Sequence, residues 1–435
     1  MNTGSPIDLA GGMSRSAAQG PAAGGRAMAV LLACLVVVMI GFGVTLPVLP
    51  FYVERVLQPG SSGERDVAVE VGLLTAAYPL MQLVAAPLWG RWSDSVGRRR
   101  LVLVGIGGAA AAQALFAVAT TREMLYLTRV VGGLLSSAIL PAAAAYVTDI
   151  TTPGGRVRGM AWLGSAVSLG VVVGPALGGV LVRGDFDWRV AGLQVVLPSF
   201  SVPFLASAAL SLLALGGAAR WLPESRREPV IRAGDDTASL RGLVARSDLR
   251  PLLALAIGAQ FGLAMFETTF ALYASRMWNF GPAEVGIVFM VCGLVMALSQ
   301  TGTVILLSRY VSEALQMAAG FTVMGLSLAA LLTTRSTLAI LATVAALALG
   351  TALISPNLAA LISKHGEGRA GAALGLQNAA NSLGQLGGVL GGTVLFGWNM
   401  GAPFSLAAGL LVAVGSVLAW RVRRTSPASP AGFAR

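Results

Sequence analysis

Apolar segments of about 20 residues recur along the whole chain, separated by short charged or Pro/Gly-containing breaks. A helix of that length crosses the ~30 Å hydrocarbon core of a bilayer. The composition agrees, because 55% of the residues are hydrophobic and only 11% are charged. A soluble chain of 435 residues would need far more polar surface to cover its core. The sequence therefore predicts an all-α integral membrane protein.

Twelve such segments fall into two groups of six, on either side of a polar stretch at 220–250. This division is typical of a duplicated transporter, so we expect two pseudo-symmetric six-helix bundles. The expected spans are 27–53, 67–90, 101–120, 124–149, 159–183 and 196–220, then 251–275, 283–307, 313–334, 336–362, 371–397 and 402–420. The expected regions are a disordered cytoplasmic tail (1–26), an N-terminal bundle (27–220), a cytoplasmic linker (221–250), a C-terminal bundle (251–422) and a cytoplasmic tail (423–435).

Basic residues fall unevenly on the two sides of the predicted membrane. If both termini are cytoplasmic, that side holds 22 arginines and lysines, the other side holds 7, and Arg129 lies inside the fourth span. Because cytoplasmic loops are enriched in Lys and Arg, this bias predicts a multi-pass inner-membrane protein with both termini in the cytoplasm. The same bias accounts for the net charge of +11 without a nucleic-acid partner.

Few residues of the chain could support catalysis or bind a metal. The single histidine, His365, argues against a histidine-built metal centre, and Cys34 and Cys292 lie in apolar segments without metal-ligand spacing. An intramembrane enzyme would need paired acids or a nucleophile with a base, and the predicted spans contain no close acid pair. We therefore expect neither enzymatic activity nor a cofactor.

The segment GRWSDSVGRRR, residues 90–100, connects the second and third predicted spans. Topology alone accounts for its arginines, and that plain interpretation stays open. Topology does not require Asp94 four residues before Arg98, nor glycines at 90 and 97 that suit a tight turn. The pattern resembles the signature loop of the major facilitator superfamily. The resemblance implies that Asp94 and Arg98 form a latch between the bundles, with Gly90 and Gly97 as turn formers.

Two spans carry further resemblances to this superfamily. The first contains IGFGVTLPVLPFY, residues 40–52, which is similar to the first span of twelve-span drug:proton antiporters. The fifth contains GVVVGPALGG, residues 170–179, whose small residues recur every four positions and suit close helix packing. This order resembles the superfamily's antiporter motif, carried here by Gly170, Gly174, Pro175, Gly178 and Gly179. Ordinary packing explains the same residues, and the two interpretations are compatible.

The eleventh span repeats the four-residue spacing of the fifth. Ala380, Gly384, Gly388 and Gly392 lie four positions apart. The two spans occupy matching places in the two groups of six. The shared spacing therefore supports an internal duplication of the chain.

Arg129 lies about 10 Å inside the fourth span at ~1.5 Å per residue. A guanidinium at membrane depth costs ~2.5–3.5 kcal/mol on insertion scales, so it normally pairs or faces water. Its position resembles the span-four arginine of the superfamily, and the resemblance implies a role in proton transfer. Snorkelling of the side chain to the outer surface is the alternative.

Glu267 is the only charged residue in the 25 positions between Arg250 and Arg276. Its segment, FGLAMFETTFALY, resembles the seventh span of bacterial multidrug exporters, which implies that Glu267 couples export to proton entry. Removal from water favours the neutral carboxyl, while a cationic substrate favours the ionised one, so proton and substrate would exclude each other. The alternative is a carboxyl held neutral by hydrogen bonds to Thr268 or Gln260.

The resembled exporters have a second acid in the tenth span, where this chain has TALISPN, residues 351–357. Less cationic substrates are therefore plausible. Polar and aromatic positions in the spans predict the lining of a central cavity. The candidates are Tyr78, Gln82, Tyr146, Gln260, Phe266, Phe270, Asn357, Gln377, Asn378 and Asn381.

These observations together predict a monomeric exporter of hydrophobic or amphipathic small molecules such as drugs and antibiotics. The proton motive force would drive it, and two bundles would give alternating access to the cavity. A dedicated metabolite or sugar exporter of the same superfamily is the alternative. A narrow polar cavity, rich in Asn and Gln from the eleventh span, would favour that alternative.

Overall fold

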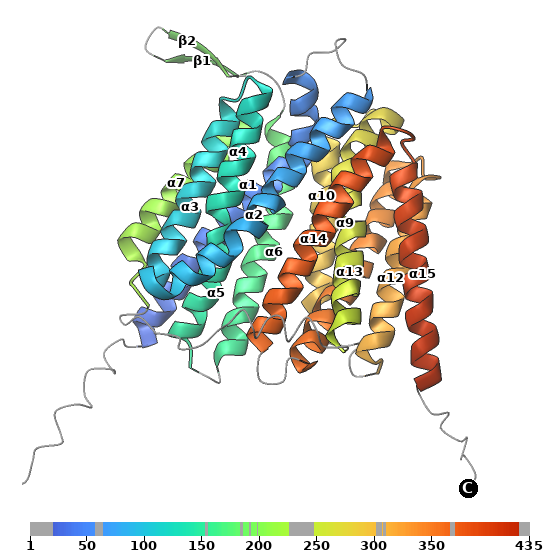
Figure 1. Cartoon of the computed structure of the whole chain (residues 1–435). Coiled ribbons are helices and arrows are strands. Elements are labelled where there is room, and N and C mark those ends of the chain that lie inside the picture. Colours follow the sequence, from blue (N-terminus) through green and yellow to red (C-terminus); the bar gives the residue numbers. More distant parts are fainter. Residues whose placement is uncertain are drawn as a thin grey trace, which may run out of the picture.

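The computed structural model describes residues 21–56, 64–152, 155–182, 186–190, 193–197, 199–225, 248–301, 307, 310–365 and 370–425. Helices dominate these residues (Figure 1). The first half contains α1 (Pro21–Val56), α2 (Glu64–Val96), α3 (Arg98–Ala117), α4 (Arg122–Leu135), the 3₁₀ turn η1 (Ser136–Ala138), α5 (Ile139–Ile150), α6 (Arg156–Leu181) and α7 (Ser201–Trp221). The second half contains α9 (Leu249–Trp278), α10 (Pro282–Thr301), α12 (Glu313–Leu331), α13 (Thr337–His365), α14 (Ala370–Phe396) and α15 (Ala402–Thr425).

The helices account for all twelve predicted spans. Eleven helical segments of the described residues are long and apolar enough to cross a membrane. The remaining one, α14, is a continuous helix of 27 residues. It contains several glycines and amides such as Gln377 and Asn381, which lower its mean hydropathy. The predicted all-α membrane fold of two six-helix bundles is confirmed.

The predicted region boundaries stay predictions, because residues 1–20, 226–247 and 426–435 lie outside the described part of the chain. Two helices nevertheless extend beyond the limits expected for the bundles. Helix α1 begins at Pro21, inside the expected N-terminal tail, and α15 continues to Thr425.

The fourth predicted span is not one continuous α-helix. Helix α4 ends at Leu135, three residues form η1, and α5 begins at Ile139. Two serine hydroxyls donate to carbonyls of the preceding turn, Ser136 to Gly132 and Ser137 to Leu134. Such hydroxyl bonds compete with the helical backbone pattern and often bend helices, so they explain the break.

The sixth span starts later than the predicted residue 196. An antiparallel hairpin of β1 (Phe186–Val190) and β2 (Leu193–Leu197) precedes it, with Phe186 paired to Leu197. Leu197 stands before a proline, which disfavours the helical conformation at that position. Helix α7 therefore begins only at Ser201.

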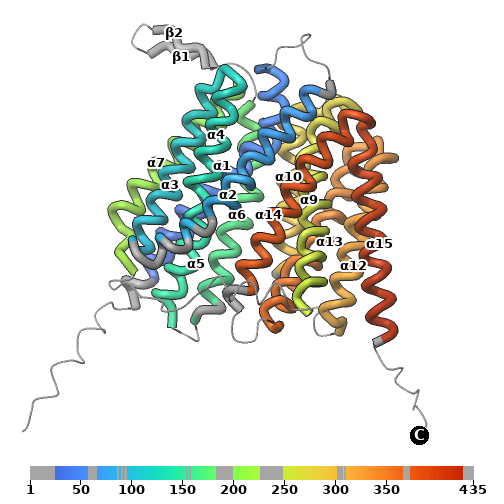
Figure 2. Tube along the Cα trace, viewed as in Figure 1, coloured from blue at the N-terminus to red at the C-terminus, as the bar shows by residue number. Residues whose placement is uncertain are grey.

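The two halves lie side by side, with the start of α1 and the end of α15 at the same end of the molecule (Figures 1 and 2). They meet along two helix pairs, α2 with α14 and α6 with α10. These are the second span against the eleventh and the fifth against the eighth, so the interface itself follows the expected pseudo-twofold symmetry.

Glycines bring the backbones of the most intimate helix pairs together. A Cβ added to Gly174 of α6 would lie 2.6 Å from the Ile40 carbonyl oxygen and 2.7 Å from the Gly43 Cα of α1. A Cβ on Gly388 of α14 would collide in the same way with the Phe261 carbonyl oxygen of α9. The glycine stripes of the fifth and eleventh spans thus perform the same packing task in both halves.

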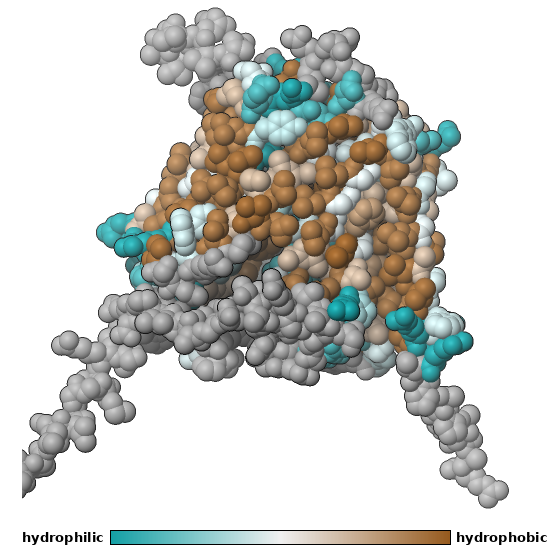
Figure 3. Space-filling model, viewed as in Figure 1, coloured by the Kyte–Doolittle hydropathy of each residue, from teal (hydrophilic) through white to brown (hydrophobic). Residues whose placement is uncertain are grey.

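The outer surface suits a bilayer. Apolar side chains cover the middle of the face shown in Figure 3, and hydrophilic residues gather at its upper and lower margins. Exposed apolar residues are spread over several helices, for example Leu213 on α7, Leu298 on α10 and Val417 on α15. A soluble monomer rarely exposes so continuous an apolar surface.

Substitution of Gly174 by Ala tests the backbone contact between α6 and α1. The new Cβ cannot fit without separating the helices, so we expect Gly174→Ala to destabilise the protein by ~1–3 kcal/mol, typical of overpacking. The measurement is the thermal unfolding midpoint of purified protein in detergent. Gly164→Ala on the same helix is the matched control, because a Cβ there meets nothing within 4 Å. Equal midpoints for the two variants would contradict the contact.

Candidate functional site

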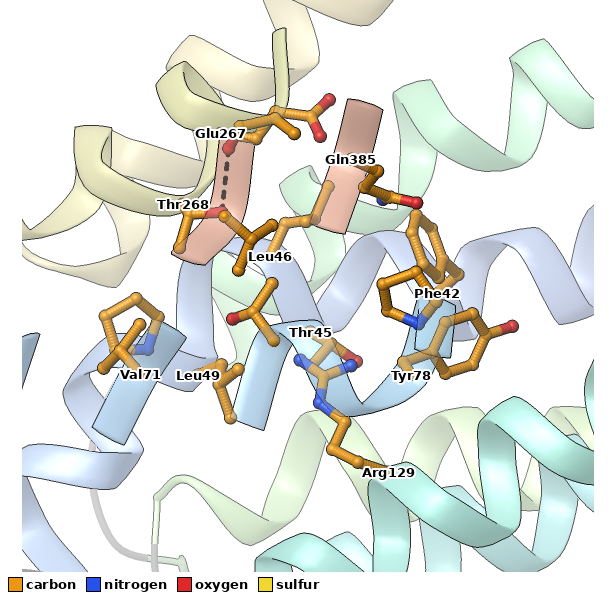
Figure 4. A pocket seen from close by; sticks show the side chains of 15 residues that line it. Phe42, Thr45, Leu46, Leu49, Val71, Tyr78, Arg129, Glu267, Thr268 and Gln385 are labelled. Atoms are coloured by element: carbon orange, nitrogen blue, oxygen red, sulfur yellow. Dashed lines mark hydrogen bonds between the residues drawn. The ribbon is translucent and has the colours of Figure 1, made fainter. Parts of the chain in front are cut away.

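A cavity lies between the two halves, enclosing about 530 Å³ of empty space that includes its opening to solvent. Helices α1, α2 and α4 of the first half line one side, and α9 and α14 of the second half line the other (Figure 4). Most lining side chains are apolar or aromatic. The lining residues are Phe42, Thr45, Leu46, Leu49, Pro50, Val71, Thr75, Tyr78, Pro79, Arg129, Ala264, Glu267, Thr268, Gln385 and Val389.

Two of these lining residues carry a charge, Glu267 and Arg129. They come from opposite halves, Glu267 from α9 and Arg129 from α4, and Figure 4 shows them on opposite sides of the cavity. No ion pair joins them in the described structure. The cavity therefore holds one acidic and one basic side chain on opposite walls.

Glu267 is partly buried and has no hydrogen-bond partner among the described residues. The Thr268 hydroxyl, one proposed partner, donates instead to the carbonyl oxygen of Ala264 at 2.8 Å. The alternative in which Thr268 holds this carboxyl neutral therefore finds no support. Since no hydrogen bond from the described helices occupies this carboxyl, it is available to a ligand or a proton.

Arg129 is 6% exposed and has few partners for its charge. Its guanidinium carbon lies 5.4 Å from the centre of the Phe116 ring, and its buried Nε atom has no hydrogen-bond partner. The side chain points into the protein, toward Thr45 in Figure 4. Snorkelling to the outer surface, the sequence alternative, does not describe this conformation.

Two glycines of α4 position Tyr78 next to Arg129. A Cβ on Gly133 would lie 2.5 Å from the Tyr78 carbonyl oxygen, and a Cβ on Gly132 would lie 3.5 Å from the Tyr78 ring. The close approach of α2 lets the Tyr78 hydroxyl lie 3.1 Å from the Ser136 Oγ. Glycine at position 133 thus provides the room that Tyr78 needs to form an aromatic wall of the cavity.

A second cavity lies inside the first half and encloses about 410 Å³ of empty space, including its opening to solvent. It shares Phe42, Thr45, Tyr78 and Arg129 with the central cavity. Gln113 lines it and donates from Nε2 to the Gly41 carbonyl oxygen at 2.7 Å. The buried Oε1 atom of Gln113 has no partner in the described structure. Arg129 therefore lines both the central cavity and this second cavity.

Several residues predicted to line the cavity lie elsewhere. Phe266 and Phe270 are fully buried and pack against Phe289 of α10. The Tyr146 hydroxyl donates to the Pro223 carbonyl oxygen at 2.7 Å, and Asn357 donates to Gln316 Oε1 at 3.0 Å. The remaining predicted residues outside the central lining are Gln82, Gln260, Gln377, Asn378 and Asn381.

Sequence reasoning missed four polar lining residues, Thr45, Thr75, Thr268 and Gln385. Gln385 has a usable signal, because it follows Asn381 by about one helical turn and Gln377 by about two turns on the same face. Thr45 lies between the glycine and the first proline of the α1 motif. Thr268 neighbours Glu267 in sequence, and the sequence suggests it only as a hydrogen-bond donor to that carboxyl.

The loop between α2 and α3 is shorter than expected. Gly97 has φ 100°, a conformation that favours glycine, and alone separates the two helices. Gly90, expected to form a turn, instead lies inside α2, which continues to Val96. The indole of Trp89 holds this segment by donating to the Leu134 carbonyl oxygen at 2.8 Å.

The predicted latch is only partly described. The side chain of Asp94 lies outside the described residues. Arg98 is buried, and its Nε lies 3.5 Å from Oδ2 of Asp149, at the end of α5. The backbone N–H of Arg99 donates to Glu224 at 3.2 Å. These contacts connect the loop to its own half of the molecule.

At the other end of the molecule an ion pair joins the halves. Arg276, near the end of α9, lies 2.7 Å from Glu54, near the end of α1. The two side chains are 24% and 33% exposed. Because the partners belong to opposite halves, the pair favours their closure at the end away from the start of α1.

Replacement of Glu54 by Gln tests this closure. The pair is partly exposed and worth ~0.2–1 kcal/mol, so we expect Glu54→Gln to widen the distance distribution between the halves without unfolding the protein. Spin labels at Arg55→Cys and Met277→Cys, in a Cys34→Ala and Cys292→Ala background, report that distance. Glu313→Gln is the control, since the Glu313–Lys364 pair lies within one half. An unchanged distribution in Glu54→Gln would refute the role of the pair.

Comparisons with known proteins agree with this architecture. A sequence model of the Major Facilitator Superfamily matches residues 31–385. Multidrug resistance protein 1 of Bacillus subtilis (strain 168) is 27% identical over 398 residues, which cover 91% of this chain and 96% of that protein. Quinolone resistance protein NorA of Staphylococcus aureus (strain MRSA252) is 24% identical over 377 residues, or 86% and 91% of the two chains.

A solved structure shows the same fold. The human organic anion transporter MFSD10 (TETRAN) superposes with a TM-score of 0.67 at 22% identity, covering 92% of this chain and 100% of that one.

Proposed function

The chain belongs to the Major Facilitator Superfamily, and from this premise we propose that it exports hydrophobic or amphipathic small molecules in exchange for protons. The observation that carries the proposal is Glu267, the one acid lining a mostly apolar cavity between two halves. The multidrug and quinolone resistance proteins similar to this chain support a drug-like substrate class.

The exchange follows from competition for one carboxyl. An apolar cavity favours neutral, protonated Glu267, whereas an approaching cation favours the ionised form. A substrate and a proton therefore occupy the site in turn. A proton moving down ~100 mV supplies ~2.3 kcal/mol, so the proton motive force drives export without a further cofactor.

Alternating access uses the two halves as rigid bodies. If the protein lies in a bacterial inner membrane with both termini in the cytoplasm, the Glu54–Arg276 pair lies at the outer end of the molecule. This pair has to separate when the cavity opens outward. The Asp94–Arg98 latch would act at the cytoplasmic end, and the protein would work as a monomer.

The lining favours this function over a dedicated sugar or metabolite exporter. That alternative expects a polar cavity rich in amides from the eleventh span. Gln385 is the one amide of α14 that lines the central cavity in the described structure. Leu46, Leu49, Val71 and Val389 form a surface suited to apolar compounds.

Glu267→Gln tests the coupling. In inverted membrane vesicles with an imposed proton gradient, adding a transported dye or antibiotic should release protons from wild type. We expect the variant to lose at least ~90% of this release, because an amide cannot carry the proton. Fluorescence of a pH-sensitive dye measures it.

Glu123→Gln is the matched control for this experiment. It removes the same charge from a side chain that is 77% exposed at the start of α4, so full release is expected. Persistent compound-dependent release in Glu267→Gln would show that this carboxyl is structural and would remove the basis of the proposal.

A further inference from the structure

We propose that Arg129 is a carboxylate-binding residue, and that the preferred substrates are amphipathic compounds carrying a carboxylate. This inference rests on the proposed function, since it names the substrate class of the same cavity. It assigns Arg129 to ligand binding, whereas the sequence resemblance implied a role in proton transfer.

The first observation is a buried cation without a counter-charge. Arg129 is 6% exposed, and no acid of the described residues forms an ion pair with it. The face of the Phe116 ring partly compensates a cation but offers no hydrogen-bond acceptor. Buried charges are normally paired, so an unpaired guanidinium at a cavity wall is suited to a partner that arrives with the ligand.

The second observation is the direction of the side chain. In Figure 4 the guanidinium points from α4 toward Thr45 and the space between the halves. Thr45 donates its hydroxyl proton to the Gly41 carbonyl oxygen at 3.2 Å, so it does not neutralise the cation. A planar guanidinium in this position presents parallel N–H donors, which match the two oxygens of a carboxylate.

The neighbouring cavity indicates on which side of Arg129 the anion binds. Gln113 presents its buried, unpartnered Oε1 there, and this acceptor would repel an anion. A water molecule suits that cavity, since it can donate to the unpartnered Gln113 Oε1. The carboxylate therefore belongs on the central side of Arg129, and the apolar body of the ligand lies against Leu46, Leu49 and Val389.

Glu267 limits how such a ligand can lie. It lines the same cavity from the second half, and its ionised form repels a carboxylate placed beside it. The acid end of the ligand is thus directed to the first half of the molecule and the remainder to the second. A ligand that also carries a cationic group can place it beside Glu267, where it competes with the proton as the proposed exchange requires.

A matched pair of probes tests the proposal, dansyl-phenylalanine and its carboxamide, which differ in the anionic group alone. Their binding to purified full-length protein in detergent is measured by dansyl fluorescence without a proton gradient. Wild type should bind the carboxylate about tenfold more tightly than the amide, the factor expected for a charge-assisted hydrogen bond. Arg129→Gln should abolish this preference and leave the affinity for the amide unchanged.

Two further variants separate binding from folding. Arg129→Lys should restore part of the preference, because it keeps the charge but loses the bidentate geometry. Arg122→Gln should keep the full preference, because Arg122 lies on the same helix but its side chain is 56% exposed and pairs with Glu70 and Glu123. Unchanged binding of the amide shows that the cavity of each variant is intact.

Three results would overturn the proposal: no binding of the carboxylate to wild type, equal affinities for the two probes, or a preference that survives in Arg129→Gln. An equal loss of both probes in Arg129→Gln would also overturn it, since the residue would then be structural. These outcomes are independent of proton release by Glu267→Gln, so failure of the coupling proposal is recognised separately.

Discussion

Helices within a bilayer gain little by hiding apolar side chains from one another, because the lipid tails are apolar too. Close packing has to hold them together, and in this chain glycine provides it. Gly174 brings α6 against the backbone of α1, and Gly388 brings α14 against α9. The other features of the molecule depend on these contacts, since α1 and α9 carry Thr45 and Glu267 to the two sides of the cavity.

The lipid environment also explains where the charged residues lie. A charge that faces lipid is costly, so charged residues at membrane depth face cavities or partners. Glu267 and Arg129 both line the central cavity, and each comes from a different half. The cavity is therefore electrically asymmetric, although the two halves pack their helices in the same way. The two halves share a fold, but their walls of the cavity carry different charged side chains, Arg129 in the first half and Glu267 in the second.

Much of this architecture could be predicted from sequence, because it rests on one-dimensional signals. Span length fixes the helices, and a lone charge such as Glu267 in an apolar segment indicates a cavity. Side-chain direction is not such a signal. Phe266 and Phe270 flank Glu267 and were expected in the lining, yet Phe289 of α10 packs against both. Which neighbour fills a helix face is decided by the tertiary arrangement. Likewise, the break at η1 depends on two serine rotamers that spacing does not reveal. The roles of the predicted site residues remain predictions.

In the proposed alternating access, the contact between α6 and α10 would act as a hinge between the two halves. Gly179 and Gly286 face each other there, and a Cβ on either would lie 2.5 Å from a carbonyl oxygen of the other helix. At these two glycines the backbones approach each other directly, so no side chains interlock at this point when one half tilts against the other. The resistance to tilting would then come mainly from the Glu54–Arg276 ion pair and from a ligand bound in the cavity. In the proposed alternating access, a ligand in the cavity would therefore influence the relative position of the two halves.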